Sequence, residues 1–265
     1  MNDLRLYGRF VAVGYRALML YPGAFVLRTV SQTVLTGVEF ASIWAMFDRF
    51  GHIRGWSLAE VALFYAVASI AFAIGDGLSR GFDNVGPLLV KTGNFDRLLL
   101  RPRSTALQVT GLEFPLNSFG RLLQGLVVLA IAAWLLKADW GIGSALVLAF
   151  AACGGGSLFY ALKTFEGTLS FWTTEGLEVV NTLTYGGVTA AQYPLDIYAK
   201  WFRRFLLYFV PIGCSLYLPV ALVLGHDTGV PPLLAALAPA TGFAFLAVAL
   251  RFWAFGIRHY TSTGS

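Results

Sequence analysis

The sequence predicts an all-α integral membrane protein with six transmembrane helices, an N-terminal amphipathic interfacial helix and an external re-entrant helical hairpin between the fifth and sixth spans. Hydrophobic residues make up 57% of the chain and charged residues only 12%, whereas a soluble domain has roughly 25% charged residues. The apolar runs are long enough for a helix to cross a ~30 Å hydrocarbon core. They are also unbroken, unlike the alternating segments of a membrane barrel, so helices are favoured.

The segment before the first span, residues 1–22, alternates basic and apolar residues. Arg5, Arg9 and Arg16 fall on one helical face, which is typical of a helix lying in the membrane interface. A proline–glycine pair follows, and it predicts the end of this interfacial helix.

The predicted spans follow the apolar runs and form one transmembrane domain over residues 1–265. They are 25–47, 57–79, 106–136, 142–163, 168–190 and 231–256. Ser57, followed three residues later by Glu60, predicts a capping box at the start of the second span. Prolines interrupt residues 194–226, which predicts two short helices that dip into the outer leaflet without crossing it.

The Lys and Arg residues fall mostly on one side of these spans, which predicts that both termini are cytoplasmic. With the N-terminus inside, the cytoplasmic segments, including residues 80–105 and Lys163, hold more basic residues than the external ones, as is usual for cytoplasmic loops. The net charge of +5 is explained by bases that anchor helices to lipid headgroups. We therefore expect membrane lipids, and no nucleic acid, as partners of these charges.

The sequence contains no pattern that indicates catalysis or metal binding. It lacks the HExxH and GxxxxGK[ST] motifs, which carry zinc hydrolysis and phosphate binding. Its three histidines are scattered and have no metal-ligand spacing. The glycine run 154–156 lies inside an apolar span, where it predicts close helix packing. We expect no catalytic residue, metal or cofactor in this chain.

Residues 80–105 form the most polar stretch, and they combine basic with apolar residues. Pro87 favours a helix start, and Gly93 with Asn94 favours a break between two short helices. Such a segment is typical of a docking element for a cytosolic partner, although an ordinary basic loop has the same composition. The candidate docking residues are Leu88, Leu89, Lys91, Asn94, Phe95, Asp96, Arg97 and Arg101.

Two groups of polar residues lie inside predicted spans, where polar side chains are costly and indicate function. The group in the third span shares one helical face and consists of Glu113, Asn117, Arg121 and Gln124. In the fifth span, Glu175, Glu178 and Thr182 share a face, and Thr174 and Asn181 lie beside it. We interpret both groups as candidate pathway residues, with the two carboxylates of the fifth span favouring a cationic cargo. The alternatives are a third span that extends into the cytoplasm, hydrogen-bonded packing of the fifth span, and neutralisation of a carboxylate by Arg121.

Several motifs resemble one known family. The sequence GNFDRLLLRP at 93–102 resembles the cytoplasmic loop of ABC-2 type transporter permeases, and FWTTEG at 171–176 resembles the start of their fifth helix. YPLDIY at 193–198 is similar to their external re-entrant helices, and the tail 257–265 is similar to theirs. The likeness covers nearly the whole chain, and it points to a permease branch that includes viologen exporters.

The resemblance implies the transmembrane subunit of an ATP-driven exporter in a bacterial plasma membrane. Two such subunits, identical or paired with a sister permease, would sit on two ATP-binding subunits that hold ATP and Mg²⁺. The segment 91–103 would carry the coupling helix, and a hydrophobic or cationic amphipathic cargo would pass between the permeases. Two alternatives remain, a proton-coupled secondary transporter and a membrane scaffold without a transport role. A carrier is disfavoured because 265 residues are few for two repeats, and no repeat is visible.

Overall fold

The computed structural model describes residues 22–50, 52, 54–113, 116–137, 140–173 and 177–262, and the regular elements among them are helices. The predicted interfacial helix over 1–22 lies outside this part of the chain, apart from Pro22, which begins the first described helix. The all-α prediction is therefore confirmed for the described residues.

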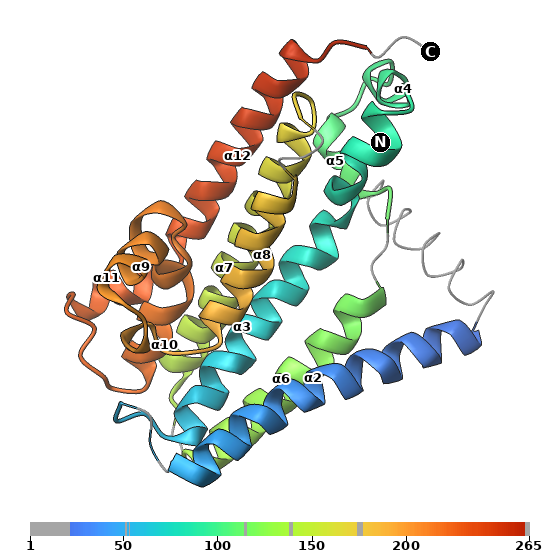
Figure 1. Cartoon of the computed structure of the whole chain (residues 1–265). Coiled ribbons are helices and arrows are strands. Elements are labelled where there is room, and N and C mark those ends of the chain that lie inside the picture. Colours follow the sequence, from blue (N-terminus) through green and yellow to red (C-terminus); the bar gives the residue numbers. More distant parts are fainter. Residues whose placement is uncertain are drawn as a thin grey trace.

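In the described part of the chain, six longer helices make up the bundle (Figure 1), and each overlaps one of the six predicted spans. They are α2 (Pro22–Phe50), α3 (Leu58–Ser79), α6 (Leu116–Leu135), α7 (Ile142–Leu169), α8 (Leu177–Ala191) and α12 (Ala240–His259). The central helix is α3, which packs on α6 and α7, and α12 packs against the far side of α7. The capping box predicted for the second span is confirmed, because Ser57 and Glu60 bond reciprocally at the start of α3.

Small residues let α3 and α7 approach closely. A Cβ atom on Gly75 would lie 2.6 Å from the Cβ of Phe159, and one on Gly156 would lie 2.8 Å from Ile74. These distances are shorter than van der Waals contact, so only glycine fits. The glycine run predicted to serve helix packing does so, since Gly154 and Gly155 meet neighbouring segments equally closely.

Four described helical segments are long and apolar enough to cross a membrane: Leu58–Val90, Ser118–Leu135, Ile142–Leu169 and Ala240–His259. The bent pair Lys200–Phe209 and Gly213–Val223 makes a fifth if it counts as one span. α8 has 15 residues and is about 22 Å long at 1.5 Å per residue, which is shorter than the ~30 Å core. The protein is thus a multi-pass membrane protein, and the six-span count remains a prediction.

The second span continues further than the sequence predicted. α3 passes directly into η1 (Arg80–Asn84) and η2 (Val85–Val90), so one helical rod runs from Leu58 to Val90. Pro87 lies inside this rod and does not begin a helix. Because proline has no N–H and clashes with the preceding turn, the rod departs from α geometry here and forms 3₁₀ and π turns. The predicted break is confirmed at Gly93, which has a φ of +68°.

The third and sixth predicted spans are each divided into two helices. Residues 106–136 comprise α5 (Thr105–Thr110) and α6, with Pro115 in the sequence between them. Residues 231–256 comprise α11 (Pro232–Leu237) and α12, with Pro239 between them. Proline lacks an N–H and clashes with the preceding turn, which accounts for the interruption at Pro239.

The boundary between the fourth and fifth spans also moves. α7 continues to Leu169 and α8 begins at Leu177. The first residues of the predicted span 168–190 therefore belong to α7 or to the connection after it. Because α7 is longer than predicted, Lys163 and Glu166 lie inside a helix, whereas the sequence predicts that the span ends at residue 163.

Residues 194–226 form a compact group of short helices at one end of the bundle (Figure 1). They are η3 (Leu195–Ile197), α9 (Lys200–Arg204), η4 (Phe205–Phe209), η5 (Gly213–Tyr217) and α10 (Leu218–Val223). The chain bends by 86° between η4 and η5, next to Pro211, in the geometry of a broken span or a re-entrant loop. Asp196 holds the group together, because it pairs with Arg203 at 2.6 Å and accepts a hydrogen bond from Tyr217 at 2.7 Å.

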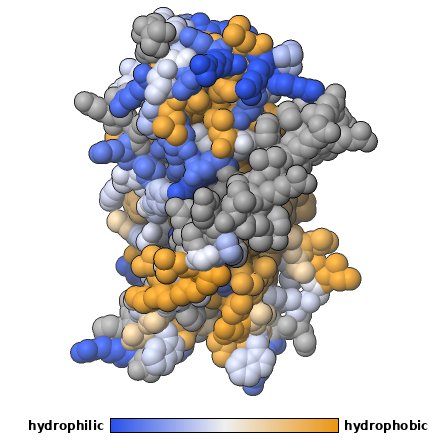
Figure 2. Space-filling view, turned by 90° about the vertical axis from the view of Figure 1, so that its right-hand side faces the viewer, coloured by the Kyte–Doolittle hydropathy of each residue, from blue (hydrophilic) through white to orange (hydrophobic). Residues whose placement is uncertain are grey.

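The opposite end carries α4 (Phe95–Leu99), α5 and the end of α12 (Figure 1). Hydrophilic residues gather over this α4 end, and an apolar band lies below it on the side that carries α2 and α6 (Figure 2). The band includes exposed residues of both helices: Val26, Leu27, Val30, Val34, Leu35, Val38, Leu123, Leu126, Val127 and Ile131. Such a surface is stable in contact with lipid or another membrane subunit, and not with water.

Candidate functional site

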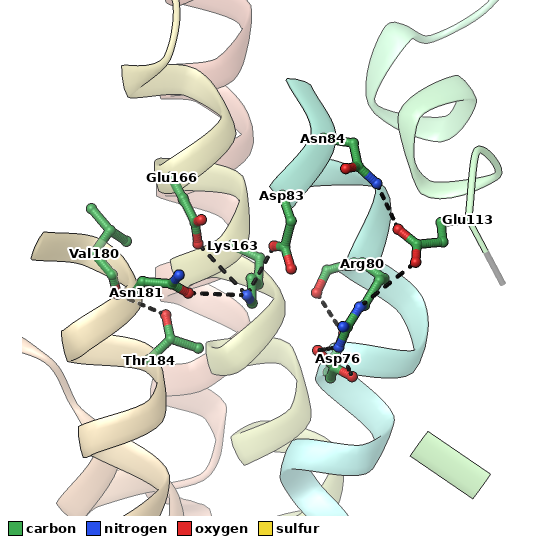
Figure 3. Close-up of polar contacts among 12 residues, drawn as sticks. Asp76, Arg80, Asp83, Asn84, Glu113, Lys163, Glu166, Val180, Asn181 and Thr184 are labelled. Carbon is green, nitrogen blue, oxygen red and sulfur yellow. Dashed lines mark hydrogen bonds and ion pairs between the residues drawn. The ribbon is translucent and has the colours of Figure 1, made fainter. Parts of the chain in front are cut away.

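A buried lysine joins three helices near the α4 end of the bundle (Figure 3). The Nζ atom of Lys163, on α7, lies 2.8 Å from Oδ1 of Asp83 on η1 and 3.7 Å from Oε2 of Glu166. It also donates to Oδ1 of Asn181 on α8 at 3.5 Å. We call these four residues the Lys163 cluster. The lysine side chain is only 1% exposed, so its charge depends on these oxygens in place of water.

The local sequence explains why these groups meet. Lys163 and Glu166 are three residues apart on α7, so they lie on the same face of the helix. Asp83 reaches the lysine because α3 continues into η1 and does not end at residue 79. The ring of Tyr185 lies under the ammonium at 4.9 Å and adds a cation–π contact.

A second ionic group lies on the side of α3 that faces α6 (Figure 3). Asp76 accepts hydrogen bonds from Arg80 at 3.3 Å and from Ser118 at 2.9 Å. Arg80 also lies 3.9 Å from Glu113, which accepts a bond from Asn84 at 2.6 Å. We call these five residues the Arg80 cluster. Its outer members, Asn84 and Glu113, line a pocket of about 450 Å³ together with Leu88, Leu89 and Leu112.

The polar residues predicted for the third span face α3 inside the same subunit. Arg121 stacks its guanidinium 4.6 Å from the ring of Phe72, and Gln124 donates to the hydroxyl of Tyr65 at 3.2 Å. Glu113 precedes α6 and belongs to the Arg80 cluster. The side chain of Asn117 lies outside the described part. The contacts thus bring Glu113 and Arg121 to α3, and their role in a pathway stays a prediction.

The polar residues predicted for the fifth span divide between two faces of α8. Asn181 turns inward to the Lys163 cluster, whereas Glu178 is exposed and forms no ion pair among the described residues. Thr182, Tyr185 and Thr189 are exposed as well, at helical spacings that place them along the same side as Glu178, and the edge of this side reaches the Lys163 cluster through the ring of Tyr185. We call these four residues the α8 face. Thr174 and Glu175 lie outside the described residues.

The candidate docking residues also divide into buried and exposed members. Leu89 and Phe95 are buried beside Trp253 of α12, and the ring of Phe95 lies 4.9 Å from those of Phe171 and Tyr260. These two side chains therefore anchor the segment. The members at the surface are Leu88, Lys91, Arg97 and Arg101, with Leu99 and Leu100 beside them.

Polar contacts fix the same segment to the end of the chain. Asp96 accepts a hydrogen bond from Ser262 at 2.7 Å, and Asn94 donates to Thr92 at 2.8 Å. Partial burial, followed by the negative charge of Asp96, raises the pKa of Tyr260 above its usual value. The docking segment and the tail after α12 consequently form one surface.

Sequence reasoning missed most of the two ionic clusters. The sequence places Lys163 in a cytoplasmic segment. Such a segment implies a solvent-exposed side chain, which is wrong here, because Lys163 is buried and paired with Asp83. Asp76, Arg80 and Glu166 were also overlooked. The available signal was the presence of charged residues next to apolar runs, which by itself suggests a functional site.

Fold and site together define a helical membrane protein with buried charges between its helices and a polar, anchored segment at one end. The model of the family described as ABC-2 family transporter protein matches residues 33–264. The chain belongs to this family, and it is a permease subunit of an ABC transporter. Such permeases are normally non-enzymatic and generally work with a separate ATP-binding subunit. No curated protein and no solved structure matches the chain.

Proposed function

We propose that this permease exports a hydrophobic or cationic amphipathic compound, of drug-like or viologen-like character, and that ATP hydrolysis in a partner subunit drives the export. The observation that carries the cargo proposal is the α8 face, where an exposed carboxylate and hydroxyl groups occur within a membrane bundle. Such groups are costly against lipid. A pathway between two permease subunits would provide the water and the partner surface that they need.

The proposed architecture has six spans. Four of them are the long apolar segments described above, and the other two are α2, which is less apolar, and α8, which is shorter. Both termini would lie in the cytoplasm, with residues 194–226 as a re-entrant hairpin outside. Two points support this orientation: the α4 end carries Lys91, Arg97 and Arg101 at its surface, and basic segments favour the cytoplasmic side. The membrane would be the plasma membrane of a bacterium.

The proposed complex contains two permeases, identical or sister chains, and two ATP-binding subunits that carry ATP and Mg²⁺. The exposed residues Leu88, Leu99 and Leu100 would enter a groove on the ATP-binding subunit, with the surrounding bases at the rim. Closure of the ATP-binding subunits would move this segment, and the rod from α3 to η2 would transmit the motion into the bundle. The chain itself would need no cofactor.

Transport of a compound panel by the intact complex tests the cargo proposal. Glu178→Gln keeps the shape of the side chain and removes its charge, so we expect a several-fold loss of transport for cations and a smaller change for neutral compounds of similar size. Asp227→Asn is the matched control, because Asp227 is an exposed carboxylate in the loop after α10 and its loss changes net charge equally. Equal losses for cations and neutral compounds would contradict a pathway role.

A proton-coupled secondary transporter is the second candidate, and the carboxyl groups of the Lys163 cluster, of which Glu166 is buried, are the observation that favours it. The two functions differ in their energy source. A chain that purifies alone and moves cargo on a proton gradient without ATP would support the second function and overturn the first.

A further inference from the structure

The Lys163 cluster contains one more negative group than positive. Lys163 faces two carboxyl groups, Asp83 and Glu166. The other charged groups near the cluster on the rod are Asp76 of α3 and Arg80 of η1, which pair with each other at 3.3 Å. From α8 the cluster is faced by the amide of Asn181 and the ring of Tyr185, which are uncharged. A single ammonium group is therefore the positive partner of both carboxyl groups.

The two carboxyl groups are not equivalent. Asp83 is the closer to the ammonium, at 2.8 Å, and its side chain is 25% exposed. Glu166 is farther, at 3.7 Å, and is 4% exposed. Oε2 of Glu166 and Oδ1 of Asp83 are both buried atoms without a well-formed hydrogen bond among the described residues, but the Glu166 oxygen lies farther from the ammonium, at 3.7 Å against 2.8 Å. Burying an ionised carboxylate without partners is so costly that the group normally takes up a proton.

We propose that Glu166 is a proton-binding site, held as a neutral carboxylic acid beside the ionised Lys163–Asp83 pair. The proton comes from water and adds to the Glu166 carboxylate, so no bond is broken and no other reactant is needed. With this proton the cluster carries one positive and one negative charge and is neutral. Removing the proton from Glu166 would leave one uncompensated negative charge in the interior, which is energetically unfavourable.

The chemistry of the cluster fits a proton better than a larger cation. A hard metal ion needs about six oxygen ligands, and no group of three or more acidic, histidine or cysteine residues among those described is arranged to hold a metal ion. The ammonium of Lys163 already occupies the space next to Asp83. The burial of Lys163 and Glu166 also excludes a drug-sized cation unless the helices separate.

Whether Glu166 holds its proton depends on which of the two carboxyl groups pairs with Lys163. If Asp83 withdraws, Glu166 becomes the nearest carboxyl group, and the positive charge then favours the ionised form of Glu166. Motion of η1 would consequently release the proton, and its return would take the proton up again. This consequence rests on the proposed function, because it requires the docking segment to move η1, whereas the proton site itself does not.

Infrared spectroscopy of the purified full chain in lipid nanodiscs tests the site without an ATP-binding subunit. We expect the C=O absorption of a buried carboxylic acid at neutral pH. Labelling glutamate carboxyl groups with ¹³C should shift this band in the wild-type protein. Glu166→Gln should abolish it, and Glu113→Gln, the matched control at a half-exposed carboxyl group, should keep it.

A second variant gives the sharper prediction. Asp83→Asn leaves Lys163 with Glu166 as its only acidic partner, so Glu166 should ionise and the band should disappear although Glu166 is still present. Absence of the band in wild-type protein at neutral pH, or a band insensitive to glutamate labelling, would overturn the proposal. If the band is present but indifferent to ATP in the assembled complex, the site stands and only its link to the proposed function is lost.

Discussion

The Lys163 and Arg80 clusters share a charge pattern but differ in their surroundings. Each places one cation between two carboxyl groups, on opposite sides of the rod that begins with α3. Arg80 and Glu113 are 29% and 42% exposed, and Asn84 and Ser118 supply extra hydrogen bonds to the acids. Lys163 and Glu166 are almost fully buried. The acids of the Arg80 cluster therefore have hydrogen-bond donors besides the cation, including the buried Asp76, whereas Glu166 has only Lys163 as an ion-pair partner among the described residues.

The largest difference between the clusters is expected when the cation is removed. Lys163→Met leaves the Asp83 carboxylate without its counter-charge, next to the buried Glu166, and should cost about 3–5 kcal/mol of unfolding free energy. Arg80→Met, the matched variant, should cost less, because the buried Asp76 keeps its hydrogen bond from Ser118 and Glu113 is 42% exposed. Unfolding of both variants in detergent micelles, followed by circular dichroism, measures the two losses. Equal losses would show that burial does not distinguish the clusters.

A smaller effect is expected at the glycines between the clusters. A Cβ atom on Gly81 would lie 1.9 Å from the carbonyl oxygen of Val109, so Gly81→Ala should displace α5 and cost about 1–3 kcal/mol. A Cβ atom on Gly77 would lie 3.6 Å from Ser118, which is ordinary contact, and Gly77→Ala should be nearly neutral. The same unfolding experiment compares them. A Gly81→Ala variant as stable as wild type would contradict the close packing of α5 on η1.

The smallest expected effect concerns the exposed bases of the docking segment. The double variant Arg97→Ala with Arg101→Ala should leave stability unchanged. It should weaken the binding of the ATP-binding subunit by about tenfold, since charges at the rim of an interface contribute modestly to affinity. Asp96→Ala with Arg97→Ala should additionally loosen the tail, because Asp96 bonds to Ser262, and should uncouple ATP hydrolysis from transport. Affinity measurements with the purified partner test both. Unchanged binding and unchanged transport in both variants would exclude this docking surface.

The sequence was informative about the parts of the fold that depend on local pattern. Apolar runs located the long helices, and the Ser57–Glu60 spacing located the start of α3. The prolines accounted for interruptions only in part. Pro87 was expected to start a helix but lies within one, because the rod takes up 3₁₀ and π turns in place of ending.

The candidate site was less predictable because it depends on pairing between helices. Glu178 is exposed on α8, and its role in a pathway stays a prediction. The inward turn of Asn181 could not be predicted, since it depends on Lys163 one helix away. Likewise the burial of Leu89 and Phe95 is decided by Trp253, which is distant in the sequence. Periodicity places a residue on a face, but only the packing of helices decides what that face meets.

ATP-dependent uptake of a cationic cargo into inside-out vesicles containing the permease and its ATP-binding partner tests the central claim most directly. We expect uptake that requires ATP, persists when the proton gradient is collapsed, and falls in Glu178→Gln but not in Asp227→Asn. Uptake that continues without ATP and stops when the proton gradient is collapsed would contradict an ATP-driven exporter.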